Sequence, residues 1–159
     1  MRVVPRFTLQ SGERMRLLAL DVGERRIGLA SGVAGPGIAL PAGVLRRTRL
    51  AVDVQAVLEA ARQRGVDAIA VGVPVRPGGE ESLQTKRVRG FIRALRKETC
   101  LPVHVVDEAF TSVEAEALLR EAGMEPSRDR GAVDEAAAVL ILRRFLESLS
   151  QSPLSSKEC

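Results

Sequence analysis

The chain has 159 residues and a formal net charge of +4, with 45% hydrophobic and 28% charged residues. These values are typical of one soluble globular domain that is long enough for its own core. The longest uncharged apolar run, residues 136–142, is far too short to span a bilayer, and the first six residues lack the apolar segment of a signal peptide. We therefore expect a cytoplasmic protein with no membrane partner.

The charge and the aromatic content bear on the kind of partner. A positive net charge is compatible with binding to the phosphates of a nucleic acid, although many basic proteins bind no nucleic acid. The chain has no Trp, no Tyr and only four Phe. So few aromatic residues argue against a protein that stacks single-stranded bases on its surface. If nucleic acid is the partner, we expect its shape and backbone to be recognised.

Both ends of the chain lack a sustained hydrophobic period. Residues 1–14 are interpreted as an N-terminal extension, and the serine-rich residues 149–159 as a disordered tail. A single folded domain is therefore expected over residues 15–148.

Three strands are predicted first in this domain, as an antiparallel meander over residues 16–22, 25–31 and 38–46. The elements that follow are helix, strand, helix, strand, helix and helix, predicted over residues 50–64, 68–73, 81–98, 103–106, 111–122 and 133–148. The strand at 68–73 is short and fully apolar, as in a buried parallel sheet. This order predicts an α/β fold with a mixed five-stranded sheet and helices on both faces.

Three acidic residues stand where apolar segments begin or end. Asp21 and Glu108 each close such a segment, whereas Asp134 opens one. A carboxylate at the mouth of a core element is costly unless a cation neutralises it. If the three converge in space, they form an oxygen-ligand site that suits Mg²⁺ or Mn²⁺ better than zinc. Such a site can activate water and bind a phosphodiester.

Each acid also has an ordinary structural explanation. Asp21 precedes a glycine and could start a turn, while Glu108 and Asp134 could interact favourably with helix N-termini. Asp134 continues an apolar stripe with Ala138, which argues that its carboxylate faces inward. Glu135 lies on a neighbouring stripe, so the pattern alone does not choose between these two acids.

Four motifs occur in order along residues 16–147. They read Leu-Ala-Leu-Asp-Val-Gly at 18–23, Val-Gly-Val-Pro at 71–74, Val-Asp-Glu-Ala-Phe-Thr-Ser at 106–112 and Val-Asp-Glu-Ala-Ala-Ala at 133–138. Together they resemble the YqgF/RuvX family. This resemblance implies a ribonuclease H-like fold related to the RuvC resolvases. Family members are described as Holliday-junction resolvases and as nucleases that mature the 5′ end of pre-16S ribosomal RNA.

The resemblance implies that Asp21, Glu108 and Asp134 are the catalytic and metal-binding residues, and it prefers Asp134 over Glu135. We therefore predict a hydrolase, an endonuclease that uses two Mg²⁺ or Mn²⁺ ions to cleave phosphodiester bonds. Its predicted partner is structured nucleic acid, with branched DNA and pre-16S RNA both left open.

The chain departs from the family pattern in two places. The family usually carries Asp-Glu-Arg where this chain has Ala109 after Glu108, so one expected cation is missing. The loop after Pro74 lacks the usual Asn and Asp, and its Arg76 could supply the missing charge. Because several arginines flank the acids, five of them are predicted to contact phosphate: Arg25, Arg26, Arg76, Arg128 and Arg130.

Two other functions compete with the nuclease. An ATPase or sugar kinase of the actin–hexokinase class needs two domains around its nucleotide, and this chain has one. A catalytically weak nucleic-acid-binding module is the alternative that the missing arginine keeps open. The oligomeric state is also open, but we favour a homodimer because RuvC relatives cut junctions as dimers. Its surface is expected on the helix at 81–98 or on the last helix.

Overall fold

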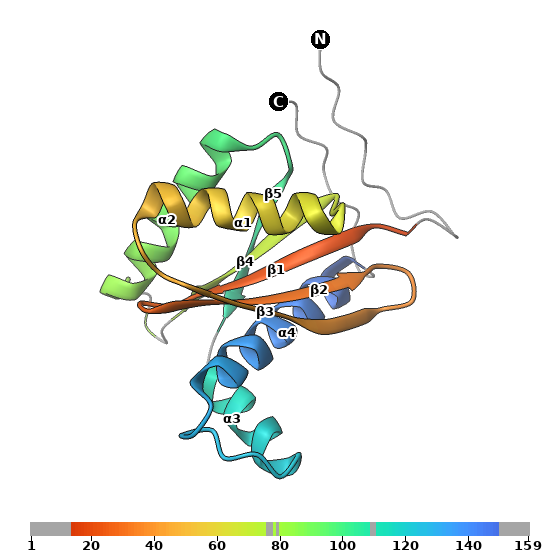
Figure 1. Cartoon of the computed structure of the whole chain (residues 1–159), viewed down its shortest axis with the longest axis vertical. Helices are drawn as coiled ribbons and strands as arrows, with labels where there is room; N and C mark the ends of the chain where they lie inside the picture. The colour runs from red at the N-terminus through yellow and green to blue at the C-terminus, as the bar shows by residue number, and fades with distance from the viewer. Residues whose placement is uncertain (1–13, 76–77, 79, 109–110, 150–159) are drawn as a thin grey trace.

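The computed structural model describes residues 14–75, 78, 80–108 and 111–149, and its strands form one five-stranded sheet (Figure 1). The strands are β1 (Arg16–Val22), β2 (Arg26–Val33), β3 (Ile38–Arg46), β4 (Ala68–Pro74) and β5 (Val103–Glu108), in the order β3-β2-β1-β4-β5. β1, β2 and β3 pair antiparallel, whereas β4 pairs parallel with both β1 and β5. The predicted mixed sheet is confirmed. The proposed extension, apart from Arg14, and the proposed tail, apart from Leu149, lie outside the described residues.

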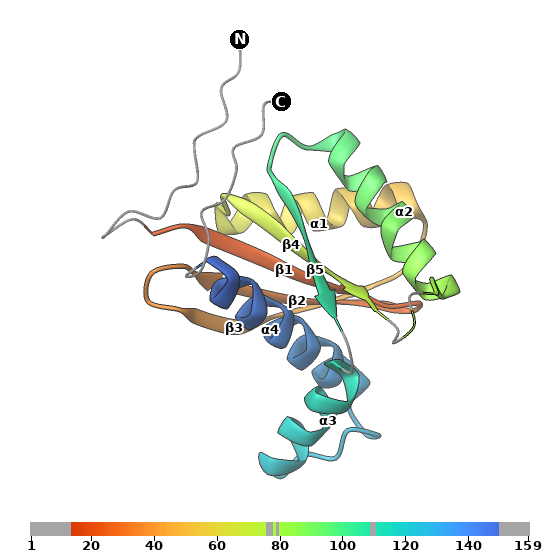
Figure 2. The ribbon, with the colours of Figure 1, turned by 180° about the vertical axis from the view of Figure 1, so that it is seen from behind.

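Helices cover both faces of this sheet. They are α1 (Leu50–Arg64), α2 (Leu83–Glu98), α3 (Thr111–Glu121) and α4 (Arg130–Leu149). Figures 1 and 2 show α1 and α2 on one face and α4 on the other, with α3 beside the first half of α4 and beyond the sheet. Within the described part of the chain, no helix has the length and apolarity needed to cross a membrane.

The alternation along β1 divides the core between the two faces. Leu18 and Leu20 point to the α1/α2 side, where they join a cluster that includes Phe91 of α2. Leu17 and Ala19 point to the α4 side and pack in a second cluster. All five side chains are almost fully buried. The strand period of two therefore gives β1 two buried faces, as its continuous apolar run predicts.

Several predicted boundaries were wrong by a few residues. Helix α2 begins at Leu83 because the Ser82 side chain caps it and accepts a hydrogen bond from the Thr85 amide at 3.1 Å. Helix α4 begins three residues earlier than predicted, where Asp129 accepts a hydrogen bond from the Ala132 amide at 2.9 Å. Strand β5 continues to Glu108 because it remains in register with β4.

Candidate active site

The three predicted acids lie on three elements that approach one edge of the sheet. Asp21 is the second-last residue of β1 and Glu108 is the last residue of β5. Because β1, β4 and β5 are parallel, both residues stand at the carboxyl ends of their strands. Asp134 lies in the second turn of α4, on the face of the sheet that this helix covers. Strands and helix thus bring distant parts of the sequence to one place.

A glycine on β2 lets α4 approach Asp21. Gly28 is the cross-strand partner of Asp21, and a Cβ atom on Gly28 would overlap the carbonyl oxygen of Asp134. Only a residue without a side chain allows this contact between helix and strand. Gly28 therefore sets the distance between the elements that carry these two carboxylates.

A second glycine makes room for Glu108. A Cβ atom on Gly72 of β4 would overlap the Ile141 side chain and lie 3.1 Å from Cγ of Glu108. Gly72 therefore lets α4 and the Glu108 side chain occupy the same part of the sheet surface.

The surroundings of Asp21 disfavour its charged form. Burial, and to a smaller extent the neighbouring charge of Asp134, together raise its pKa to about 7. Two carboxylates that repel each other in a buried place are stabilised by a cation between them. The electrostatics of this pair therefore fit a metal-binding role.

Glu108 is the most enclosed of the three acids. It is 6% exposed, and neither side-chain oxygen has a hydrogen-bond partner among the described residues. Its pKa is raised to about 7, because burial, with the charges of Asp21 and Glu114, outweighs the opposing effect of Arg144. Nη1 of Arg144 lies 3.7 Å from Oε1 of Glu108, which is an ion-pair distance. A buried carboxylate without a hydrogen-bond donor is a suitable ligand for a divalent cation.

Asp134 is held by an arginine. Nε of Arg26 donates a hydrogen bond to Oδ2 of Asp134 at 2.6 Å, so this predicted phosphate contact instead forms an ion pair with a predicted metal ligand. No group of three His, Cys, Asp or Glu side chains within the described residues is arranged to hold a metal ion. The donor set is made of carboxylate oxygens, which suit Mg²⁺ or Mn²⁺, and Asp134 is ion-paired with Arg26.

Glu135 has a different role from Asp134. The backbone amide of Gly43 on β3 donates a hydrogen bond to Oε2 of Glu135 at 2.9 Å. Gly43 has a φ of 107° and lies beside an irregularity in the β2/β3 register. Glu135 thus ties α4 to β3, and Asp134 is the acid that faces Asp21. The sequence pattern alone does not show which of these two acids belongs to the site.

Comparison with known proteins identifies the family. A model of the RuvX family, described as Holliday junction resolvase, matches residues 15–148. The chain belongs to the RuvX family. A relative from Koribacter versatilis, named "Putative pre-16S rRNA nuclease", is 43% identical over 148 residues, covering 89% of this chain and 94% of the relative. A relative of the same name from Thermus thermophilus is 42% identical over 132 residues, covering 83% and 97%.

A solved structure supports the fold of this RuvX chain. The chain superposes on Thermus thermophilus RuvC in complex with Holliday junction substrate with a TM-score of 0.57, covering 90% of this chain and 99% of that one. At 17% sequence identity this likeness concerns the fold alone. The predicted ribonuclease H-like fold is confirmed.

The remaining predicted arginines lie in different surroundings. Nη1 of Arg130 lies 3.4 Å from Oε1 of Glu116, so its charge is already paired. Arg25 and Arg128 are exposed and form no ion pair within the described part of the chain. Arg76 lies outside the described residues, as does Ala109. Of the four that the structure describes, Arg26 alone forms an ion pair with one of the three acids.

Sequence reasoning missed the residues that hold the backbone around Asp21. Nη1 of Arg47 donates to the Gly23 carbonyl oxygen at 2.8 Å, and Nε of Arg47 forms a 2.8 Å ion pair with the buried Asp53. Nε2 of Gln84 donates to the Val22 carbonyl oxygen at 2.8 Å. The contacts of Arg47 with Gly23 and of Gln84 with Val22 join residues 24 and 62 positions apart, so no local pattern could reveal them.

Proposed function

We propose that this RuvX protein is a divalent-metal-dependent endonuclease that acts on structured nucleic acid. The observation that carries the proposal is the buried carboxylate of Glu108 at the carboxyl edge of the sheet. It has no hydrogen-bond partner in the part of the chain that the structure describes, and it is electrostatically coupled to Asp21. Asp21 is in turn coupled to Asp134. The family description and the relatives' printed names support nuclease chemistry.

Three residues would hold the metal ions, namely Asp21, Glu108 and Asp134. When bound, two divalent ions supply an activated water and stabilise charge on the scissile phosphate. Arg26 is ion-paired with Asp134, so this carboxylate would have to separate from Arg26 to serve as a metal ligand. Arg144 lies 3.7 Å from Glu108 and donates a hydrogen bond to Glu114 at 3.2 Å, so it is held by Glu114 as well. Arg26, once separated from Asp134, would be available to the negatively charged substrate.

The experiment is cleavage by the purified chain with Mg²⁺ or Mn²⁺ on three substrates side by side. These are a four-way DNA junction, a linear DNA duplex and an RNA with the pre-16S 5′ extension. We expect metal-dependent cleavage of the junction, the RNA or both, and none when the metal is chelated. Absence of cleavage on both structured substrates contradicts the proposed function.

The alternative function is a nucleic-acid-binding module without cleavage. Its supporting observation is the Arg26–Asp134 ion pair, which opposes assembly of the three carboxylates. Tight binding of the same substrates, with no products after long incubation with Mn²⁺, is the result that this alternative predicts.

The junction substrate adds a requirement on assembly. Two strands must be cut at symmetry-related places, so a resolvase needs two sites on a two-fold axis. We propose a homodimer on this substrate, measurable by sedimentation with junction DNA. A strict monomer that processes pre-16S RNA would contradict the resolvase activity and leave the nuclease site intact.

A further inference from the structure

Helix α2 carries an excess of positive charge, and its basic residues are not among those of the candidate active site. Its 16 residues include six Lys or Arg and one acid, which gives this helix a formal charge of +5. The whole chain has a net charge of +4, so all residues outside α2 sum to −1. The basic character of the protein therefore resides in one helix.

Three of these cations form a stripe along the outer side of α2. Lys86, Arg93 and Lys97 are exposed, and their spacing of seven and four residues places them on one helix face. This face lies opposite the buried Val88 and Leu95. At 1.5 Å per residue, the stripe is about 16 Å long. None of the three forms an ion pair with another described residue.

The stripe begins beside the candidate active site. Gln84 on α2 donates to the carbonyl oxygen of Val22, the residue after Asp21. Oγ1 of Thr85 donates to the carbonyl oxygen of Pro74, which is the partner of Glu108 in the sheet register, at 2.9 Å. The first turn of α2 is thus fixed to the strand ends that carry two of the acids, and the helix leads away from them (Figure 2).

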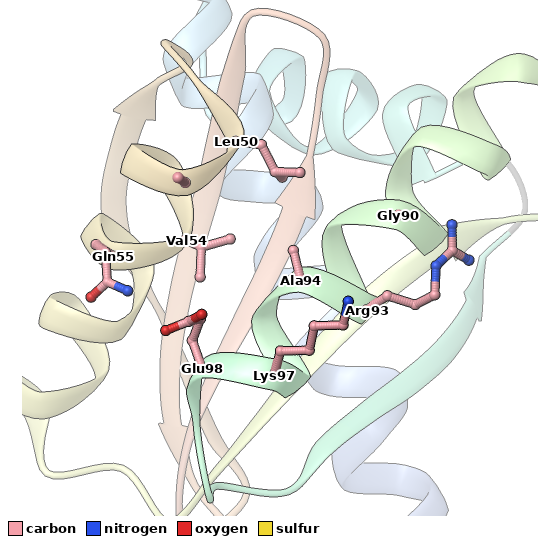
Figure 3. A pocket seen from close by; sticks show the side chains of 9 residues that line it. Leu50, Val54, Gln55, Gly90, Arg93, Ala94, Lys97 and Glu98 are labelled. Carbon is pink, nitrogen blue, oxygen red and sulfur yellow. The ribbon is translucent and has the colours of Figure 1, made fainter.

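The far half of the stripe borders a groove between α1 and α2. This groove has a volume of about 420 Å³, and Figure 3 shows Arg93 and Lys97 on its α2 side. Leu50, Val54 and Ala94 supply apolar walls. Long basic side chains can pack their stems on such apolar surface while their charged ends remain in solvent. The charged ends are therefore placed for an extended polyanion.

We propose that Lys86, Arg93 and Lys97 bind the phosphate backbone of the nucleic acid as it leaves the active site. This inference rests on the proposed function and names a surface for the same substrate. A second protein copy is a poorer occupant, because two α2 helices of charge +5 facing each other across a two-fold axis would repel. Of the two helices expected to form a dimer surface, this leaves α4.

The test compares two triple variants of the full chain, both in an Asp21→Asn background that prevents cleavage. One replaces Lys86, Arg93 and Lys97 by Ala. The matched control replaces Arg14, Arg16 and Arg143, which are also exposed and without an ion pair in the described part of the chain. Affinity for a labelled four-way junction and a labelled pre-16S RNA is measured by fluorescence anisotropy over a series of salt concentrations.

We expect the α2 variant to reduce the slope of log K against log salt by roughly 2 to 3, since each lost phosphate contact on duplex removes about 0.9. The control should keep the wild-type slope. In the active background, the α2 variant should keep its cleavage rate at saturating substrate and lose affinity.

Equal slopes for the α2 and control variants overturn the inference. A changed sedimentation coefficient with an unchanged slope also overturns it and assigns α2 to a protein contact. If the wild-type chain neither binds nor cleaves, the proposed function itself has failed.

Discussion

The two faces of the sheet are built from side chains of different size. The face under α1 and α2 is filled by large residues such as Leu18, Ile69 and Phe91. The face under α4 contains many small ones, namely Ala19, Ala30, Ala68 and Ala70, and Ala138 of α4 belongs to the same cluster. Gly28 and Gly72 also contact α4. A helix can approach a sheet closely only where side chains are small. The first face therefore serves mainly stability, and the second positions the acids.

This difference predicts that substitutions on the two faces have different effects on stability and on the positions of the acids. A cavity on the α1/α2 face lowers the free energy of unfolding but leaves the carboxylates in place. A bulky atom on the α4 face moves Asp134 relative to Asp21.

The largest expected effect on stability is that of Leu95→Ala. Leu95 is fully buried on α2, far along the helix from the acids. Loss of its side chain should cost about 2–5 kcal/mol in the free energy of unfolding. Urea denaturation measures this cost. The folded fraction should retain its metal-dependent cleavage rate, and a loss of activity per folded molecule would contradict the division of roles between the faces.

Gly28→Ala should lower the free energy of unfolding less than Leu95→Ala does, but it should reduce cleavage more. Its Cβ would overlap the Asp134 carbonyl oxygen, so α4 must shift, at a cost of about 1–3 kcal/mol. We expect cleavage to be lost while the variant remains folded by circular dichroism. Gly90→Ala on α2 is the matched control, because its Cβ meets only the end of the Arg93 side chain at 3.7 Å. It should stabilise the helix by up to about 1 kcal/mol.

The pH dependence of stability should come from the α4 face. The pKa values of Asp21 and Glu108 are raised to about 7, so the folded state binds more protons than the unfolded state between pH 4 and 7. Stability without metal therefore falls as the pH rises through this window, by at most about 1.4 kcal/mol per pH unit for each group. Asp21→Asn should flatten the fall, as measured by thermal unfolding from pH 4 to 8. An unchanged profile would count against the raised pKa of Asp21.

The smallest expected effect is that of Arg144→Gln. Its guanidinium is the cation that opposes the raised pKa of Glu108. Because Arg144 is partly exposed, its loss should cost no more than about 1 kcal/mol at pH 8. The exposed neighbour Arg143→Gln should have no measurable effect. Equal unfolding midpoints for the two variants would show that Arg144 does not stabilise the Glu108 carboxylate.

Local patterns in the sequence were sufficient for much of the fold. The bounds predicted for β1, β3 and α1 match the structure because apolar periodicity and a helix-ending glycine are local signals. The site could be predicted only in part. The ion pair between Arg26 and Asp134 joins residues 108 positions apart, and no spacing rule indicates it.

The contrast between Asp134 and Glu135 shows the same limit. Both lie at the start of one helix, and the choice between them depends on the Gly43 amide of β3, which lies 92 positions away from Glu135. The basic excess of α2 was visible in the sequence. What the sequence could not show is that Arg87 and Arg89 of α2 are paired with acids, whereas Lys86, Arg93 and Lys97 form no ion pair with another described residue.

Mn²⁺ binding measured by isothermal titration calorimetry tests the central claim most directly, with Asp134→Asn and Glu135→Gln as a matched pair. The account predicts that Asp134→Asn loses both Mn²⁺ binding and cleavage, as Asp21→Asn and Glu108→Gln also should. Glu135→Gln should retain both, because its amide oxygen can still accept the hydrogen bond from Gly43. Full Mn²⁺ binding and cleavage in Asp134→Asn, or their loss in Glu135→Gln alone, would contradict the assignment of the active site.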